Sequence, residues 1–363
     1  MKKSKKISIV ILSIVMVMGM TFGISGCGST NESSDETFDL TMTVHSASTT
    51  AYAKALDEWA AEMSEKSDGR LNIDISYGGT IAAAENTVDV TVDGGADLCW
   101  STVPLNNSKF KYINVFSCFG EDITNSMSAT KALVDLVKNN KDIAGEYEKL
   151  GLKLVGIHAL TPNALCSVDK KFQSTEDFNG VSVMAISSAN IAVLEGLGAA
   201  PQGIVTTDLY ENFSKNVSDA SLVDASLYES TSSYEQVNYW CTYNFSTCVS
   251  FIAMNQGVYD SLPSDLREII DSSFDDLSYS CAEYVNSNFQ KFVGKIRESG
   301  IEMYDISDDL LVDVEDLINT EVYGPWEKMC KEDGVDAAAI TDSIEKSLKA
   351  GNKEYGEEYT WYK

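Results

Sequence analysis

The chain has 363 residues, with 55 Asp and Glu against 27 Lys and Arg, so its formal net charge is −28 at pH 7. A charge this negative excludes nucleic acids and anionic membrane surfaces as general partners, because both would repel the protein. Two domains are the natural expectation for a chain of this length.

The first 26 residues have the features of a secretory signal peptide. The basic start "MKKSKK" is followed by an apolar run that stops at small residues, and such a segment is removed from the mature protein. The run ends in "ISGC", which resembles a bacterial lipobox, so we expect Cys27 to be acylated. Residues 27–37 are then a polar tether. The protein is expected on the extracytoplasmic face of the cell membrane, held by its lipid; an ordinary secreted or signal-anchored chain is the alternative.

Seven cysteines remain besides Cys27. An odd number in an exported protein predicts at least one free thiol or an intermolecular bond, and no CxxC or Cys-His spacing indicates a metal. Most of them lie in apolar runs, where cysteine acts as a small buried hydrophobe. We therefore expect reduced packing residues, with Cys241 and Cys248 as the first pair to test for a disulfide.

The segment after the tether alternates predicted strands and helices. "FDLTMTVHS", "GRLNIDISYG" and "ADLCWST" have the pattern of strands, whereas "TTAYAKALDEWAAEMSEKS" and "TIAAAENTVDVTVDGG" have the pattern of helices. This alternation predicts a parallel sheet with helices on its faces.

A second series of strands and helices begins near Thr161-Pro162. It includes "ALCSV", "GVSVMAIS", "ANIAVLEGLG" and "ASLVDASL", and the apolar stretch "YWCTYNFSTCVSFIAMN" then leads back to the first series. We predict two α/β lobes with a cleft between them. Lobe I comprises residues 38–161 and about 251–290, and lobe II comprises residues 162–250 and about 291–363, including C-terminal capping helices.

A helical pattern holds from about Ser264 to Ser299, with Gly294 as its only glycine and no proline. This is far longer than the usual globular helix. A coiled coil is one interpretation, but the apolar positions do not keep a strict heptad. A long helix spanning both lobes fits better.

Signals for catalysis are sparse. The chain has two histidines, His45 and His158, and neither has a serine or cysteine at motif spacing. Phosphate-loop, nucleophile-elbow and HExxH motifs are absent from the sequence. A glycosidase-like carboxylate pair would make the protein a secreted hydrolase, but no pair stands out in so acidic a chain. We expect a binding protein without catalytic residues, metal or cofactor.

Four short motifs occur in an order and spacing known from one receptor family: "DFNG" at 177–180, "LGAAP" at 197–201, "DLY" at 208–210 and "SLP" at 261–263. With them, the chain from Phe38 to Lys349 resembles the DctP-type substrate-binding subunits of tripartite ATP-independent periplasmic (TRAP) transporters. The resemblance implies a two-lobed, periplasmic-binding-protein-like α/β fold, a Venus flytrap. It also implies a monomeric receptor that closes on a small-molecule solute and passes it to small and large membrane subunits. A ligand sensor for a membrane signalling kinase is the alternative.

The chain departs from that family where a ligand would bind. The strand matching "GVSVMAIS" usually presents an arginine that pairs with a substrate carboxylate, and here the position is Met184. Asn163 stands where a second basic residue is common, and Val223 stands where an asparagine is common. Without a charged partner, a buried carboxylate is costly, so we expect a neutral, cationic or substantially apolar ligand. A core-filling Met184 in a shifted register is the alternative interpretation.

Further cleft candidates follow from the strand ends together with the resemblance. Trp100 is expected to stack on an aromatic ligand or to hold a cation, although a core aromatic at a strand end is an equal alternative. The other candidates are polar or aromatic residues near predicted strand ends or on flanking helices: His45, Ser46, Asn86, Ser101, Thr102 and Tyr210.

Overall fold

The computed structural model describes residues 36–359, 361 and 362, and Thr37–Lys363 forms a compact unit of its own. The signal peptide, Cys27 and nearly all of the tether expected from the sequence lie outside the described residues. Across the ranges that the structure describes, no helix is both long enough and apolar enough to span a membrane.

One sheet contains the first three strands of the unit. β1 pairs in parallel with β2 and β3, and β9 lies antiparallel between β3 and β4. The sheet is therefore mixed, whereas the sequence predicted a parallel one, because β9 returns from a distant part of the chain. The strands are β1 (Phe38–Val44), β2 (Leu71–Ser76), β3 (Leu98–Thr102), β4 (Leu152–Ser167) and β9 (Thr247–Asn255).

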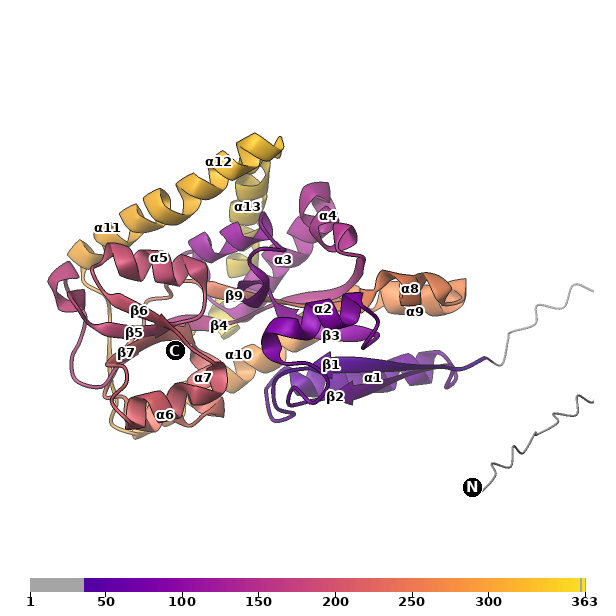
Figure 1. Cartoon of the computed structure of the whole chain (residues 1–363), viewed down its shortest axis with the longest axis horizontal. Coiled ribbons are helices and arrows are strands. Elements are labelled where there is room, and N and C mark those ends of the chain that lie inside the picture. Colours follow the sequence, from indigo (N-terminus) through magenta and orange to yellow (C-terminus); the bar gives the residue numbers. More distant parts are fainter. Residues whose placement is uncertain (1–35, 360, 363) are drawn as a thin grey trace, which may run out of the picture. The chain divides into compact units, whose positions relative to one another are not determined.

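The second sheet is joined to the first through β4. Residues Leu152 to Pro162 of β4 pair with β9, whereas Asn163 to Ser167 pair with β7. From there the order is β7, β5 and β6, with β8 and β10 on a separate branch. Figure 1 shows β4 and β9 between the two groups of strands. The additional strands are β5 (Ser182–Ala185), β6 (Ala200–Gly203), β7 (Ala220–Asp224), β8 (Tyr239–Cys241) and β10 (Glu302–Tyr304).

β4 is a single strand of 16 residues. The sequence predicted a change of direction near Thr161-Pro162, but the strand continues through this point and changes its partner instead. A register irregularity between Ala159 and Pro162 accommodates the proline, which has no N–H for the ladder. The partner change coincides with the start predicted for the second lobe; the lobe boundaries as a whole remain a prediction.

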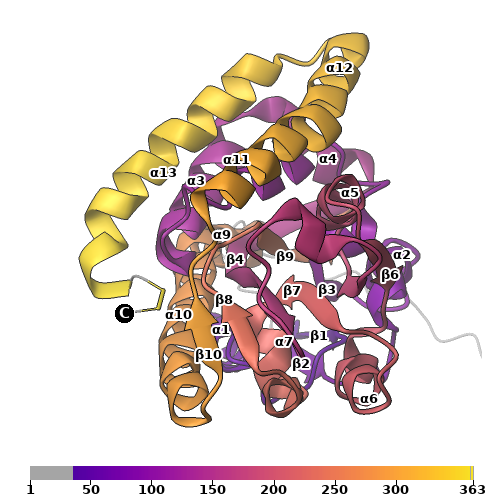
Figure 2. The ribbon, with the colours of Figure 1, turned by 90° about the vertical axis from the view of Figure 1, so that its left-hand side faces the viewer.

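Helices cover both sheets. The helix predicted over "TIAAAENTVDVTVDGG" is shorter than expected, with a 3-10 turn at Ala84–Asn86 followed by α2. Figure 2 shows the outer layer formed by α11, α12 and α13, and α13 packs on α3. The first helices are α1 (Ala53–Lys66), α2 (Thr87–Val92), α3 (Ser126–Asn139), α4 (Lys141–Lys149), α5 (Ser188–Gly196), α6 (Leu209–Ser214) and α7 (Ala225–Ser230). The later ones are α8 (Gln256–Ser261), α9 (Ser264–Ser272), α10 (Phe274–Glu298), α11 (Asp308–Leu317), α12 (Gly324–Asp333) and α13 (Ala337–Tyr359).

The long helix predicted from Ser264 to Ser299 is divided into α9 and α10. The division falls at Ser273, whose φ of −86° and ψ of −5° leave the α-helical geometry. The Ser273 hydroxyl donates to the Ile270 carbonyl and accepts a bond from Trp59 Nε1 at 2.8 Å. The 25-residue helix α10 nevertheless contributes side chains to two hydrophobic cores. Leu277 and Val285 belong to the core around α1, and Phe292 belongs to the core around Trp240.

All seven cysteines in the described part of the chain are free thiols, including Cys241 and Cys248. Five of them are buried, as expected for packing residues. Burial raises the pKa of both the Cys241 and the Cys248 thiol, which disfavours their reactive thiolate forms.

Glu146 on α4 gives folding stability a pH dependence. Its carboxylate is buried and accepts bonds from the N–H groups of Tyr112 at 2.7 Å and Ile113 at 3.1 Å. Burial nevertheless raises its pKa to about 7, above the ~4.3 of an unfolded chain. The native state therefore holds a proton that the unfolded state releases, so this group's contribution to stability falls as pH rises from about 4 through 7.

We expect Glu146→Gln to flatten this part of the pH dependence. Urea denaturation at pH 5, 6, 7 and 8 would measure it, and Glu148→Gln, at an exposed position of the same helix, is the matched control. Equal slopes for Glu146→Gln and the unsubstituted protein between pH 5 and 8 would contradict the prediction.

Candidate functional site

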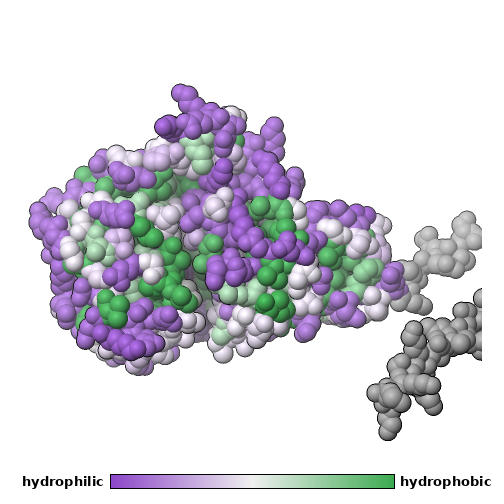
Figure 3. Space-filling view, viewed as in Figure 1, coloured by the Kyte–Doolittle hydropathy of each residue, from purple (hydrophilic) through white to green (hydrophobic). Residues whose placement is uncertain are grey.

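A cavity of about 230 Å³ lies where the two sheets meet. Figure 3 shows hydrophobic residues gathered near the middle of one face, where the surface is hollowed between the part carrying α5 to α7 and the part carrying α2 and β3. The walls come from the loop after β1, the ends of β3 and β7, the middle of β4, and the first turns of α5 and α7. The lining residues are His45, Ser46, Ala47, Thr50, Tyr52, Trp100, Thr102, Pro104, Leu105, Leu160, Asn163, Ile186, Ser187, Asn190, Thr207, Leu222, Val223, Asp224, Ser226, Leu227, Ser230, Thr231 and Cys248.

Three aromatic rings form one wall of the cavity. Tyr52 stacks on Trp100 with ring centroids 4.2 Å apart and planes at 9°, and His45 lies 5.2 Å from the same indole. A hydrogen bond holds the Trp100 indole in place, because its Nε1 donates to Nε2 of the buried His158 at 3.0 Å. Burial lowers the pKa of His158 to about 4, so at neutral pH this imidazole is uncharged and able to accept the bond.

Asp224 is the only carboxylate among the described lining residues. It ends β7 and caps α7, where its Oδ1 accepts bonds from the N–H of Ser226 at 3.0 Å and from the Ser226 hydroxyl. Its Oδ2 is buried, and no described group donates to it with normal hydrogen-bond geometry. Burial raises the pKa of Asp224 to about 6, although hydrogen bonds from Ser226 and Thr161 lower it in part. At neutral pH this carboxyl is therefore mostly ionised.

The cavity carries little positive charge to oppose Asp224. The described lining residues include neither lysine nor arginine. Burial lowers the pKa of His45 to about 4, so its imidazole is neutral at pH 7, and its Nδ1 is buried without a partner. The described lining therefore bears a net negative charge at neutral pH.

A chain of side-chain hydrogen bonds connects the second sheet with α5. Asn163 Nδ2 donates to Ser246 Oγ at 2.6 Å, and Ser246 Oγ donates to Asn190 Oδ1 at 2.8 Å. Asn190 is held in turn by the N-terminal cap of α5, since its N–H donates to Ser187 Oγ at 3.0 Å. These bonds fix polar groups at the cavity wall before any ligand binds.

Six of the ten residues predicted for the site line the cavity. They are His45, Ser46, Trp100, Thr102, Asn163 and Val223. Trp100 is a buried aromatic with an exposed fraction of 2%, and it also lines the cavity. Whether any of these residues contacts a ligand remains a prediction.

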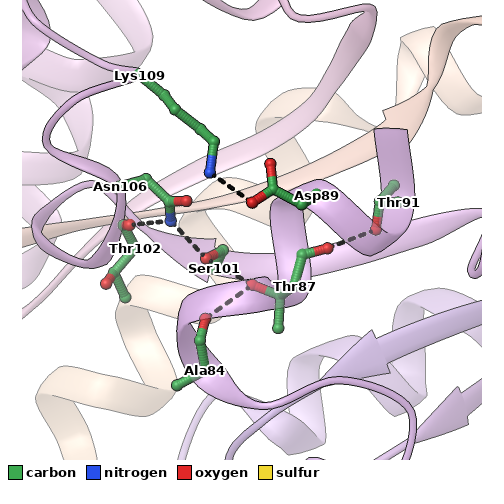
Figure 4. A network of polar contacts seen from close by, with 8 residues as sticks. All are labelled: Ala84, Thr87, Asp89, Thr91, Ser101, Thr102, Asn106 and Lys109. Carbon is green, nitrogen blue, oxygen red and sulfur yellow. Dashed lines mark hydrogen bonds and ion pairs between the residues drawn. The ribbon is translucent and has the colours of Figure 1, made fainter. Parts of the chain in front are cut away.

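Asn86, Ser101 and Tyr210 lie outside the cavity lining. Asn86 is exposed at the start of α2, and Tyr210 is exposed on α6. Ser101 alternates with Trp100 and Thr102 along β3, so its side chain points to the opposite face of the sheet. Figure 4 shows it accepting bonds from Thr87 at 2.9 Å and Asn106 at 3.0 Å. Ser101 thus has a scaffold role, holding α2 and the loop after β3 together.

Met184 also lies outside the lining, with 1% of its side chain exposed in the core that contains Val223 and Trp240. It pairs with Ser221 of β7, and Ile186, two residues further on, lines the cavity. Ile186 lies just beyond the end of β5. Met184 itself fills the core, which is the packing role given to it by the alternative interpretation.

Tyr52 and Asp224 were missed by the sequence interpretation. Tyr52 falls within a segment predicted to be helical, but it precedes the first residue of α1 and stacks on Trp100. Asp224 carried a usable signal, because it is the last residue of a strand followed directly by a helix, where α/β proteins bind ligands. The described residues contain no group of three or more His, Cys, Asp or Glu side chains that could hold a metal ion.

Comparison with known proteins agrees with this architecture. Residues 41–324 match the DctP family, described as bacterial extracellular solute-binding protein, family 7. A marine metagenome TRAP solute-binding protein, solved with 3-hydroxybenzoate, is 19% identical over 88% of this chain and 100% of its own, with a TM-score of 0.78. A Bordetella bronchiseptica TRAP protein with bound mandelate is 17% identical over 86% and 99%, with a TM-score of 0.77.

A Bordetella pertussis receptor that binds pyroglutamic acid is 16% identical over 86% of this chain and 99% of its own, with a TM-score of 0.73. These similarities confirm the two-lobed Venus flytrap fold that the sequence predicted. Together with the match over residues 41–324, they show that the chain belongs to the DctP family of bacterial extracellular solute-binding proteins.

Proposed function

We propose that this protein is the extracytoplasmic receptor of a TRAP transporter, which binds one small solute in the described cavity and delivers it to small and large membrane subunits. The observation that supports this most is the cavity itself, which is lined from both sheets at the place where they share β4. Binding between two lobes that close by a hinge is how such receptors enclose a ligand.

The experiment is a thermal-shift screen of the purified protein against acids, amines, sugars and neutral aromatic compounds. A ligand that binds only the native state raises Tm as its concentration rises. We expect at least one small solute to do so and to be recovered unchanged by mass spectrometry, as required of a receptor without turnover. Conversion of the solute would instead support a hydrolase.

The ligand is proposed to be neutral, cationic or substantially apolar. The absence of Lys and Arg from the described lining supports this, since a carboxylate would enter without a charged partner. The relatives named above were solved with aromatic acids or pyroglutamate, so this receptor would differ from them in ligand charge. A screen in which simple carboxylates bind most tightly would contradict this part of the proposal.

The lipid anchor is proposed on the lipobox at Cys27, within the segment "ISGC". Cys27→Ser removes the thiol that would be acylated, so we expect it to shift the protein from the membrane fraction to the soluble exported fraction. Cell fractionation with immunoblotting would measure the shift. Cys118→Ser, which keeps Cys27, should leave the protein on the membrane. Membrane retention of Cys27→Ser would argue for a signal anchor instead.

Gene context separates transport from signalling. Neighbouring genes for a small and a large membrane subunit would support the transport role, whereas a neighbouring histidine kinase would favour a ligand sensor using the same cavity.

A further inference from the structure

Asp224 has the features of a side chain built to meet a ligand. It is 7% exposed, lines the cavity, and uses Oδ1 for the cap of α7. The capping bonds hold the carboxylate in one orientation, and Oδ2 has no donor of normal hydrogen-bond geometry among the described residues, although Thr161 lies close enough to lower the pKa of the carboxyl. A buried ionised oxygen without a partner is unfavourable, so a ligand that donates to Oδ2 would remove this cost on binding.

The groups around Asp224 favour a cationic donor. Tyr52 at the start of α1, Cys248 from β9, and Ser226 with Thr161 interact with it, and His45 from the loop after β1 lines the same cavity. None of them carries a positive charge at neutral pH, since burial lowers the pKa of His45 to about 4. Asp224 thus lacks a cation among the described lining residues, and an incoming ammonium group would supply one.

The other wall fits the body of such a ligand. The rings of Trp100, Tyr52 and His45 gather on one side of the cavity, and aromatic faces attract both apolar groups and cations. Asn163 is the direct ladder partner of Asp224 between β4 and β7. Side chains of paired residues lie on the same face of a sheet, so the Asn163 amide is placed beside the carboxylate as a second polar contact.

We propose that the cavity takes a small organic ammonium compound, whose protonated amine donates to Asp224 Oδ2 and whose apolar part packs against Trp100 and Tyr52. This inference rests on the proposed receptor function and gives it a substrate class. It assigns Asp224 the role of ligand anchor and selects the cationic class from the broader set of neutral, cationic and apolar ligands.

The test uses sets of probes matched in size and differing in charge: benzylamine, benzyl alcohol and benzoate, with butylamine, butanol and butyrate as the aliphatic set. Isothermal titration calorimetry and thermal shift of the full-length protein in mild detergent would measure binding at pH 7.5. We expect an amine to bind most tightly in at least one set and the carboxylate to bind least. Asp224→Asn should weaken amine binding by about 10- to 100-fold, the effect of losing one bond to a charged group.

Two controls distinguish loss of charge from loss of fold. Asp169→Asn removes one exposed carboxylate from the turn after β4, outside the cavity lining, and should leave amine affinity unchanged. Benzyl alcohol should lose much less affinity than benzylamine on Asp224→Asn, because its hydroxyl makes only a neutral hydrogen bond while the cavity and its aromatic wall remain.

Several outcomes would overturn the inference. Preference for the carboxylate in both sets, or an Asp224→Asn variant with full amine affinity, would show that Asp224 is not an ammonium anchor while the receptor function stands. If neither benzylamine nor butylamine binds, but a neutral or acidic solute from the broad screen does, Asp224 is again not an ammonium anchor and the receptor function stands. If no solute of any charge binds, the receptor function fails as well.

Discussion

Trp100→Ala is expected to abolish high-affinity solute binding and to lower the free energy of unfolding by about 3–5 kcal/mol, the usual range for removing a buried aromatic side chain. Trp100 is 2% exposed and carries the stack with Tyr52 as well as the hydrogen bond to His158. Its loss would leave a void beside the cavity and a buried imidazole acceptor without its donor. Urea denaturation and calorimetry with the best solute from the screen would measure the two effects.

Two further variants separate binding from stability. Trp326→Ala removes another buried tryptophan, whose Nε1 donates to the Tyr112 carbonyl at 3.0 Å outside the cavity lining. It should lose comparable stability but keep its solute affinity. Trp100→Phe keeps a ring and should bind more tightly than Trp100→Ala, while the unpaired His158 costs about 1–3 kcal/mol. Equal solute affinities for Trp100→Ala and Trp326→Ala would refute a ligand-contacting role for Trp100.

Gly120→Ala is the second substitution with a large expected effect. A Cβ at this position would lie 2.4 Å from the Asn244 carbonyl oxygen and 2.8 Å from the Phe245 carbonyl carbon. Both are backbone atoms, so a side-chain rotation cannot relieve the clash, and we expect a loss of at least about 1–3 kcal/mol. The displaced segment includes Ser246, the middle of the hydrogen-bond chain from Asn163 to Asn190. Solute affinity should therefore fall as well.

The matched control is Gly145→Ala on α4, where a Cβ would meet no atom within 4 Å. Alanine is favoured over glycine in a helix by about 0.5–1 kcal/mol, so this variant should be at least as stable as the unsubstituted protein. Thermal and urea unfolding of both variants would check the pair. A Gly120→Ala variant as stable as Gly145→Ala would mean that the loop before α3 shifts away from residues 244–246 at little cost.

The sequence predicted the local elements and the fold class, because alternation of apolar residues and the turns between them are local signals. It did not predict which strands pair. The return of β9 between β3 and β4, and the continuation of β4 through Pro162, depend on contacts between segments 85 to 156 residues apart in the chain. Similarly, the break at Ser273 reflects a tertiary contact with Trp59, which a helical pattern does not contain.

Cavity-lining residues were predictable where they stand at or just after the carboxyl end of a strand, as Thr102 and His45 do. Met184 was different, since the family pattern gave its strand but not the burial of its side chain in the core. Asp224 was not predicted for the site. In a chain with 55 acidic residues, one carboxylate becomes distinctive only when the structure shows that it is buried.

The strand shared by both sheets has a consequence for the kinetics of binding. If the proposed lobes close by a hinge, the step from Pro162 to Asn163 in β4, where the pairing partner changes, is the expected place for it. We then expect Asn163 and its ladder partner Asp224 to move least, and Trp100 and Tyr52 to move with the other lobe. On the proposed binding mode, we expect a solute to dock first on this polar pair and to be covered afterwards by the aromatic wall. Changes at Asp224 should therefore act mainly on the association rate, and changes at Trp100 on the residence time.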